Sequence, residues 1–479
     1  MRWLTLSWFW SAVARVAGAA PIPQPDENMP AAAAAVRAAP PLPPRHARGP
    51  ASAIRRSMTL SVIEGGAAEV FAACATGGVV TGWALYLGAR PATIGFLGAL
   101  PLAAQMVNVG AAWITDVLGP KRHTVIAMAI SRALLFVLVA LPFTPLAPSL
   151  KLALFIALIA LSTVAGVVGN TAWLAWMSDL VPPALRGRFF GHRTVSLSLA
   201  GTAATLAAGL LLDAMTRRGH PGLGLATLTA AGGTAGLIGV ALLLRQHATA
   251  HVAATAGNRW RGLRVALSEP LIRPYLRYQL AWNAAVGLSG SFFSYHLLHN
   301  LETGFTILSA HGVTVAFVRI LSGTLWGRTV DRVGGQPVVA FCSIAISAVQ
   351  LVWMIVTPHR LWPIAVEAIA SGFLWAGHGI GSTELSIGLS PRATRAFRLA
   401  AISAAAGLGF AAASTIAGQA ADWIPDRFTL LGLSWTSMHP LFLLSAVARA
   451  ITATLALRIR DPGARGTARD VPRALLGRR

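Results

Sequence analysis

The chain has 479 residues, of which 55% are hydrophobic and only 11% are charged, and its mean hydropathy is +0.62. A water-soluble domain could not bury that much apolar surface in one core, so the composition excludes an ordinary soluble protein and indicates an integral membrane protein. The net charge of +23 would also suit a nucleic-acid-binding protein. Most basic residues, however, lie between apolar runs or in the tails, where membrane orientation and anionic lipid explain them. We therefore expect the lipid bilayer as a partner and no nucleic acid.

Residues 1–57 differ in composition from the rest of the chain. From Ala19 to Pro50 the sequence is rich in alanine and proline, and such a segment buries too little apolar surface to fold alone. We interpret 1–57 as a disordered cytoplasmic tail. Two alternatives stay open, namely a signal-like segment and a translation start at Met29 or Met58.

Roughly twelve apolar runs follow, each long enough to cross a hydrocarbon layer of ~30 Å. They predict an N-terminal six-helix bundle over 58–245, a basic cytoplasmic linker over 246–273, a C-terminal six-helix bundle over 274–459 and a basic cytoplasmic tail over 460–479. The spans are placed near 58–82, 92–115, 123–143, 151–178, 192–213, 222–244, 274–298, 306–326, 337–357, 361–386, 398–421 and 438–458.

Arginine and lysine concentrate in every second loop, with the Arg217–Arg218 pair as the exception. Placing both termini in the cytoplasm puts the richer loops inside, as the positive-inside rule requires. We expect a monomeric multi-pass protein of a bacterial inner (plasma) membrane. Cys74 and Cys342 both fall within predicted spans, so we expect neither a disulfide framework nor a metal cluster.

Two short stretches repeat each other at matching places in the chain. Asp116 precedes Gly119 by three positions, and Asp331 precedes Gly334 by three, each pair at the end of an apolar run. The two aspartates are 215 positions apart, close to half of the membrane-embedded length. The repeat indicates a duplicated membrane protein. The remaining motif residues are Lys121 and Arg122 in the first copy and Gly327 and Arg332 in the second.

This organisation resembles the major facilitator superfamily over about 58–460. The first copy departs from the family's loop pattern, since Ala112 replaces the opening glycine and Val117 the basic residue. A further family motif follows the fourth span, and a looser counterpart follows the tenth. The resemblance implies an all-α membrane protein with twelve transmembrane helices in two pseudo-symmetric six-helix bundles. These further motif residues are Asp179, Arg186 and Arg188 after the fourth span, and Glu384 and Arg392 after the tenth.

The loop motifs are candidates for cytoplasmic gating. Asp116, Asp179 and Asp331 lie at helix ends near arginines and helix N-termini, both of which stabilise a carboxylate. Such contacts can close the inner mouth in one state and break in the other. The alternative, which stays open, is that they only staple loops together.

Charged side chains deep in a membrane cost free energy unless they face a cavity or a partner. Glu69 lies about eleven residues, roughly 16 Å, into the first span, near the bilayer midplane. Glu64 points about 140° away from it, so the two acids are not expected to share a site. Arg132 and Arg319 lie at comparable depth and could pair with an acid. Glu69, Arg132 and Arg319 are therefore the candidates for proton coupling, whereas Arg449 in the last span has no explanation.

In the superfamily, spans one, four, seven and ten line the central cavity. Purely structural roles are the alternative for these positions. Tryptophan anchors helices at headgroup depth, and a lone histidine is commonly satisfied by hydrogen bonds to its neighbours. The candidate cavity residues are Glu69, Asn170, Trp173, Trp282, Asn283, Glu367, Trp375 and His378.

No Gly-rich loop followed by Lys-Ser/Thr occurs, so ATP hydrolysis is not expected. We predict a secondary active transporter that moves a small organic solute, amphipathic or cationic, by alternating access, with protons as a coupling ion if Glu69 titrates. We expect no enzyme activity, cofactor or metal. The alternatives are a lipid flippase or scramblase, or a non-transporting membrane protein, on the same fold.

Overall fold

The computed structural model describes residues 51–107, 111, 114–115, 117–182, 185–248, 270–390, 395–430 and 432–476. Most of the predicted N-terminal tail, most of the predicted linker, Asp116 and Arg392 lie outside the described residues.

In the N-terminal half, the described residues of each predicted span are mainly helical. The first span is divided at Gly77, whose φ of +56° is accessible to glycine at little cost. Several helices begin with proline, whose fixed φ suits the first helical turn. The elements are α2 (Ala51–Ala75), α3 (Gly78–Tyr86), α4 (Pro91–Ala104), η3 (Gln105–Val107), α6 (Pro120–Ala140), η4 (Leu141–Phe143), α7 (Pro148–Leu180), α8 (Arg186–Arg217) and α9 (Pro221–Leu244).

The C-terminal half is likewise helical, with a small antiparallel hairpin in the long loop before its last span. In the hairpin, Arg427 lies opposite Thr436. The elements are α11 (Arg273–Gly290), α12 (Phe293–Tyr295), the π-helical turn η6 (His296–Asn300), α13 (Gly304–Val333), α14 (Gly335–Val349), η7 (Gln350–Met354), α15 (Trp362–Gly388), α16 (Arg395–Ala421), β1 (Arg427–Leu430), β2 (Leu433–Thr436), α17 (Met438–Ala456) and α18 (Val471–Leu475).

Length and hydropathy identify nine membrane-crossing helices in the part of the chain that the structure describes. Helices α4, α11 and α15 occupy the other three predicted spans. The all-α membrane fold expected from the sequence is therefore confirmed, and the described residues of every predicted span are mainly helical.

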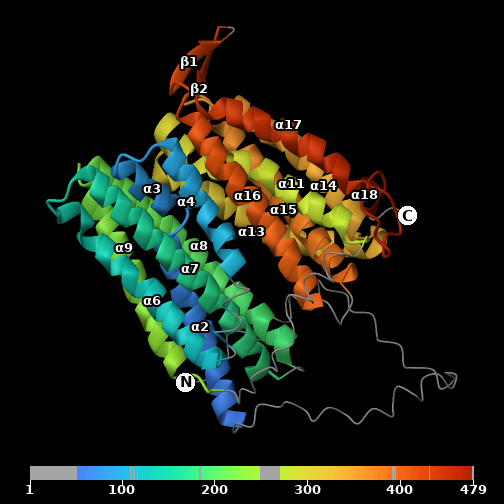
Figure 1. The fold of residues 1–479 in the computed structure, drawn as a ribbon, viewed down its shortest axis with the longest axis horizontal. Helices are drawn as coiled ribbons and strands as arrows, with labels where there is room; N and C mark the ends of the chain where they lie inside the picture. The colour runs from blue at the N-terminus through green and yellow to red at the C-terminus, as the bar shows by residue number, and fades with distance from the viewer. Residues whose placement is uncertain are drawn as a thin grey trace. The chain divides into compact units, whose positions relative to one another are not determined.

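Helix packing repeats between the two halves (Figure 1). Within the first half, α2 packs on α8 and α9, α6 on α7 and α9, and α4 on α7. Each pair has its counterpart in the second half: α11 on α16 and α17, α14 on α15 and α17, and α13 on α15. The contacts between the halves are paired in the same way, since α4 packs against α16 and α13 against α8. This arrangement is the pseudo-twofold symmetry that a duplicated chain predicts.

The hydrophobic core is shared by the two halves at one end and divided at the other. A common cluster contains Trp83, Phe155, Phe292, Trp353 and Phe442, all near loops that the sequence analysis places outside. Near the opposite helix ends, separate clusters form in each half. The halves are thus joined by apolar packing at the predicted outer end.

Candidate functional site

A cavity of about 670 Å³ lies mainly in the N-terminal half. Its walls come from α2, α4, α6, α7 and α8, and residues of α11 and α16 complete it from the other half. Four charged side chains line it, two acidic and two basic: Glu64, Glu69, Arg132 and Arg193. The predicted cavity residues Asn170 and Trp173 line it as well.

Arg193 on α8 is the central cation of this cavity. Its Nη2 lies 3.5 Å from a carboxylate oxygen of Glu64, and its guanidinium lies over the ring of Trp173, 4.2 Å from the centroid. Its Nε donates to the carbonyl of Ser61 at 3.3 Å. A desolvated guanidinium held by an acid, an aromatic face and a carbonyl is well compensated.

Glu69 lines the same cavity in a half-buried position. Its carboxylate lies against Gly201 of α8, where an added Cβ would come within 3.0 Å of it. Arg193 attracts this carboxylate as well as that of Glu64. The expectation that the two acids occupy separate sites is therefore wrong. Two acids that point 140° apart on α2 can still border a single cavity, because several helices form its walls. Arg193 interacts with both of them.

Arg132 on α6 faces Glu64 rather than Glu69. Its guanidinium lies over Phe71, 3.8 Å from the ring centroid, and donates to the hydroxyl of Ser131 at 3.0 Å. Electrostatic attraction links it to Glu64. Two arginines and two acids thus balance one another around this cavity.

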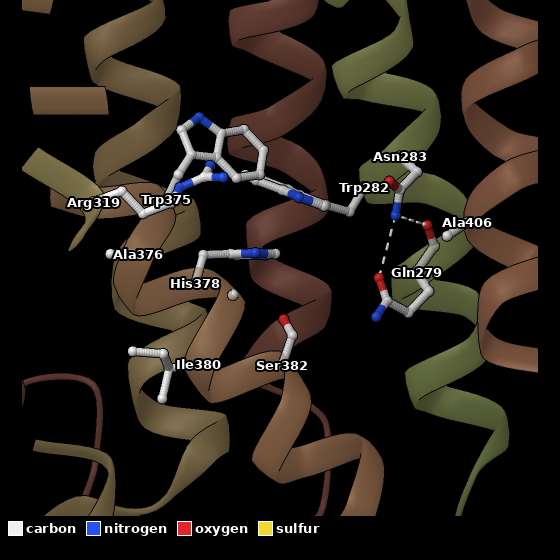
Figure 2. A pocket seen from close by; sticks show the side chains of 11 residues that line it. Gln279, Trp282, Asn283, Arg319, Trp375, Ala376, His378, Ile380, Ser382 and Ala406 are labelled. Carbon is white, nitrogen blue, oxygen red and sulfur yellow. Dashed lines mark hydrogen bonds between the residues drawn. The ribbon is translucent and has the colours of Figure 1, made fainter. Parts of the chain in front are cut away.

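A second cavity of about 460 Å³ lies in the C-terminal half (Figure 2). Five of the residues that the sequence analysis selected meet there from three helices. They are Trp282 and Asn283 on α11, Arg319 on α13, and Trp375 and His378 on α15.

Aromatic stacking holds the wall of this second cavity. The rings of Trp282 and His378 stack with centroids 5.2 Å apart and planes 22° apart. Nε2 of His378 is 2.8 Å from the hydroxyl of Tyr278, which is in turn 2.8 Å from the hydroxyl of Ser343. His378 therefore has a hydrogen-bond partner among its neighbours and also lines a cavity. The structural and the cavity-lining interpretation both apply to it.

Asn283 is also held in place, because its amide donates to Gln279 on the preceding turn, as Figure 2 shows. Sequence reasoning missed Gln279 and Tyr278. A helical spacing could have found them, since each lies four positions before a selected residue of the seventh span.

Glu367 lines neither of these cavities. Its carboxylate is 2.6 Å from Nε2 of His311 on α13 and accepts from Ser371 at 2.5 Å. Arg449 on α17 donates to Ser289 at 2.9 Å and is attracted to Glu367. The structure thus explains Arg449 as a buried cation that helps to balance Glu367.

The two copies of the loop motif have matching backbone geometry. Gly119 and Gly334 both have positive φ, +79° and +96°. Lys121 donates from Nζ to the carbonyls at the end of α9, at 3.0 Å and 2.6 Å. Gln336, at the equivalent position of the second copy, donates to the carbonyl of Ala456 at the end of α17 at 2.8 Å. Both contacts lie within one half, so these residues staple the loop to the sixth helix of their own half.

The other motif residues contact backbone more than carboxylates. Arg186 donates from Nε to the carbonyl of Val181 at 3.2 Å, and not to Asp179. Arg398 donates to the carbonyl of Leu389 at the equivalent place in the second half. Arg392, which the sequence analysis placed in this motif, lies outside the described residues. Arg122, Arg188, Asp331 and Arg332 are exposed, and the side chain of Glu384 lies against Gly335 at the start of α14.

Residues 460–476, in the predicted C-terminal tail, pack against the second motif loop. Arg332 donates to the carbonyl of Ala474 at 2.9 Å, and the amides of Arg465 and Gly466 donate to that of Val333. Val471 is fully buried. This segment covers the turn between α13 and α14.

The chain matches the sequence model of the Major Facilitator Superfamily over residues 66–377. This match covers more than half of the chain, and the protein belongs to that superfamily. It is accordingly an integral multi-pass membrane protein of a transporter family, and the resemblance noted in the sequence is confirmed.

Three solved structures illustrate the likeness of fold. The D-xylose-proton symporter has a TM-score of 0.64 at 13% identity, with 86% of this chain and 98% of that chain covered. The nucleoside transporter NupG has a TM-score of 0.60 at 14% identity, covering 85% and 98%. A bacterial homologue of the human lysosomal transporter Spinster has a TM-score of 0.56 at 13% identity, covering 90% and 99%. Comparison with curated protein sequences yields no match.

Proposed function

We propose that this protein is a secondary active transporter that moves a small organic solute by alternating access. The observation that carries the proposal is the cavity of about 670 Å³, which has ionisable side chains and residues from both halves in its wall. Its volume lies in the range of small-molecule sites. The core shared at one end and divided at the other is the arrangement of a carrier that opens toward its inner side.

Two aspartates form the outer gate of this proposed carrier. Asp213, at the end of α8, accepts from the amides of Phe305 and Thr306 at 2.7 Å and 2.8 Å, at the start of α13 in the other half. Asp422, after α16, accepts from the amide of Ala92 at 3.1 Å, at the start of α4. Each carboxylate caps a helix N-terminus across the interface, where free N–H groups and the helix dipole favour an anion. Opening the outer side requires both contacts to break.

Proton coupling through Glu69 is part of the proposal. Its carboxylate is half-buried, lines the cavity and shares the attraction of Arg193 with Glu64. When Arg193 turns toward Glu64, Glu69 loses its counter-charge and the protonated form is favoured. A turn toward Glu69 would favour release. A similar fold carries proton symport in the D-xylose-proton symporter.

The test is a screen of small organic solutes in liposomes that contain the purified protein and an internal pH-sensitive dye. The proposal expects at least one solute to accumulate when a proton gradient is imposed. Glu69→Gln should abolish that accumulation and keep solute exchange, because exchange needs alternation without net proton movement. The matched control is Glu302→Gln, since Glu302 is exposed in a loop. Full gradient-driven accumulation by a well-folded Glu69→Gln protein would refute the role of this residue, and the absence of transport of any solute would refute the carrier.

A further inference from the structure

Charge is distributed unequally between the two cavities. In the N-terminal cavity, Arg132 and Arg193 face Glu64 and Glu69. Among the described residues that line the C-terminal cavity, Arg319 is the one that carries a charge, and none is a carboxylate. Among the described residues, α15 carries two acids: Glu384, two positions beyond Ser382 of the lining, lies against Gly335 at the start of α14, and Glu367 is engaged by His311 and Ser371. Arg319 forms no ion pair within the described part of the chain.

An arginine in this position needs an anion to balance it. Arg319 lies about halfway along α13, a helix that crosses the membrane. A charge at that depth costs free energy unless a partner or water compensates it. Because guanidinium presents parallel N–H donors in a planar fork, the partner that fits it best is a carboxylate bound through both oxygens.

The surrounding side chains define the rest of the ligand. Trp282 and Trp375 have ring centroids 6.1 Å apart and planes 54° apart, so they form a corner. Trp282 is buried in it, whereas Trp375 is half-buried and keeps ring surface open to the cavity. Figure 2 shows the end of the Arg319 side chain beside Trp375. The indole N–H of Trp282 is buried and has no hydrogen-bond partner in the described structure. It is therefore an unsatisfied donor behind the wall, and the half-buried ring of Trp375 offers stacking surface to a flat group.

The wall is rigid before any ligand arrives. Trp282 is stacked between Tyr278 and His378, with centroid separations of 6.0 Å and 5.2 Å. The hydroxyl of Tyr278 is fixed by Ser343 and by Nε2 of His378. Pre-organisation of this kind lowers the entropy cost of binding.

We propose that the C-terminal cavity binds the carboxylate of a planar, aromatic monoanion, with Arg319 as the charge partner and Trp375 as the stacking surface. This inference rests on the proposed carrier function and names its substrate class. It replaces the amphipathic or cationic solute expected from the sequence. The cavity of about 460 Å³ has room for such a molecule.

The two cavities share the same faces of two helices, so one solute could pass from one to the other. Asn283 borders the C-terminal cavity, and Gly290, seven positions later on α11, borders the N-terminal one. On α16, Ala406 borders the C-terminal cavity and Phe410, four positions later, borders the N-terminal one. Residues four or seven apart lie on one helix face. The anion subsite therefore opens on the side of α11 and α16 that also faces the balanced charges of the first cavity.

Equilibrium binding to the detergent-solubilised full chain tests the proposal without requiring transport. The probes are radiolabelled cinnamate, its neutral isostere cinnamamide and the cation cinnamylammonium. Wild-type protein should bind cinnamate at least about tenfold more tightly than cinnamamide, as a charge-assisted bidentate contact implies. It should bind cinnamylammonium most weakly.

Substitutions assign that preference to one side chain. Arg319→Gln should remove the preference for cinnamate while cinnamamide binds as before, and Arg319→Lys should restore part of it. Arg328→Gln, an exposed arginine on the same helix, should behave as wild type. Size-exclusion chromatography and unchanged cinnamamide binding verify the fold of each variant.

Several results would overturn the anion subsite. These are no cinnamate binding by wild-type protein, equal affinity for cinnamate and cinnamamide, or an unchanged preference in Arg319→Gln. If Arg319 instead serves as a partner of Glu69 in another state, its substitution alters transport and leaves the charge preference intact. Charge-selective binding without transport in liposomes would refute the carrier and leave the subsite standing. Transport of neutral solutes without charge selectivity would refute the anion subsite and leave the carrier standing.

Discussion

Buried charges in this protein are compensated one side chain at a time. Glu64 is held by Arg193 at 3.5 Å, and Glu367 by His311 at 2.6 Å. Arg449, unexplained in the sequence, completes the second group from α17. Because each group draws its members from different helices, removing one member leaves a desolvated charge without its counterpart. Arg319, an exposed side chain that lines the C-terminal cavity, has no ion pair among the described residues and suggests a ligand.

Glycine positions in the second loop motif allow a sharp test at this scale. Gly334 has φ +96° and ψ +167°, a region that essentially only glycine enters. A Cβ there would also lie 2.7 Å from the Cα of Ala464 in the C-terminal segment. Gly327 lies inside α13 with open space where its Cβ would be.

We expect Gly334→Ala to lower the free energy of unfolding by about 1–3 kcal/mol. The matched change Gly327→Ala should leave it unchanged or raise it by up to about 1 kcal/mol, because alanine favours a helix interior. Thermal unfolding of the purified protein, followed by tryptophan fluorescence, measures both. Equal effects of the two substitutions would show that the turn does not constrain residue 334.

Helix ends, rather than helix faces, carry the symmetric polar contacts of this molecule. Lys121 and Gln336 bind the last carbonyls of α9 and α17, each within its own half. Asp213 and Asp422 bind the first amides of α13 and α4, each across the interface. In the proposed carrier the first pair could persist while the halves rock, whereas the second pair would have to break. On this proposal Lys121 and Gln336 are staples, and Asp213 and Asp422 are gates.

The double change Asp213→Asn and Asp422→Asn should shift the protein toward an outward-open state. An amide caps a helix N-terminus without the charge, and a loss of about 1–2 kcal/mol corresponds to roughly a tenfold change in population. The measurement is double electron–electron resonance between spin labels at Arg217→Cys and Glu302→Cys, near the predicted outer ends of opposite halves. The double variant should show a larger population of long label distances than the protein with both aspartates.

The control for this experiment is Asp470→Asn. Hydrogen bonds from Thr467 lower the pKa of the Asp470 carboxyl, but that residue lies in the C-terminal segment and contacts neither gate. Its substitution should leave the label distances unchanged. An outer distance distribution that is identical in wild type and the double variant would show that the aspartates do not hold the gate.

At the scale of the whole molecule, duplication and charge asymmetry together determine the architecture. Every helix pair within the first half recurs in the second, and the interface pairs recur as well. The basic residues concentrate in alternate loops, which orients such a duplicated bundle in the membrane. Both cysteines are buried, Cys74 at 5% and Cys342 at 0% exposure, so labelling experiments can use the native background.

Orientation is tested by labelling introduced cysteines in intact cells and in inverted vesicles. Arg90 lies in a loop and Arg188 in the first turn of α8, and both are exposed on opposite predicted sides. We expect a membrane-impermeant maleimide to label Arg90→Cys from outside only and Arg188→Cys from the cytoplasmic side only. Labelling of both from the same side would contradict the predicted topology.

Much of the candidate site followed from the superfamily resemblance, but only at the level of whole spans. Asn170, Trp173, Trp282, Asn283, Trp375 and His378 do border cavities. Arg193 escaped notice because the fifth span was expected to begin near residue 192, whereas α8 begins at Arg186 and carries Arg193 to the cavity. A boundary shift of two turns decides whether an arginine belongs to a loop or to a site.

The membrane environment, the helical segments and the duplication can be inferred from the amino-acid sequence. Each of these is local or periodic information: hydropathy over about 20 residues, proline and glycine at helix ends, and a motif repeated at half length. The pairing of charges, in contrast, becomes visible in the folded chain. The tertiary structure joins Glu64 to Arg193 and Glu367 to His311 and Arg449, and it leaves Arg319 facing a cavity among aromatic rings. Such pairings depend on how distant helices rotate and pack against one another, and no pattern within a single helix records that rotation.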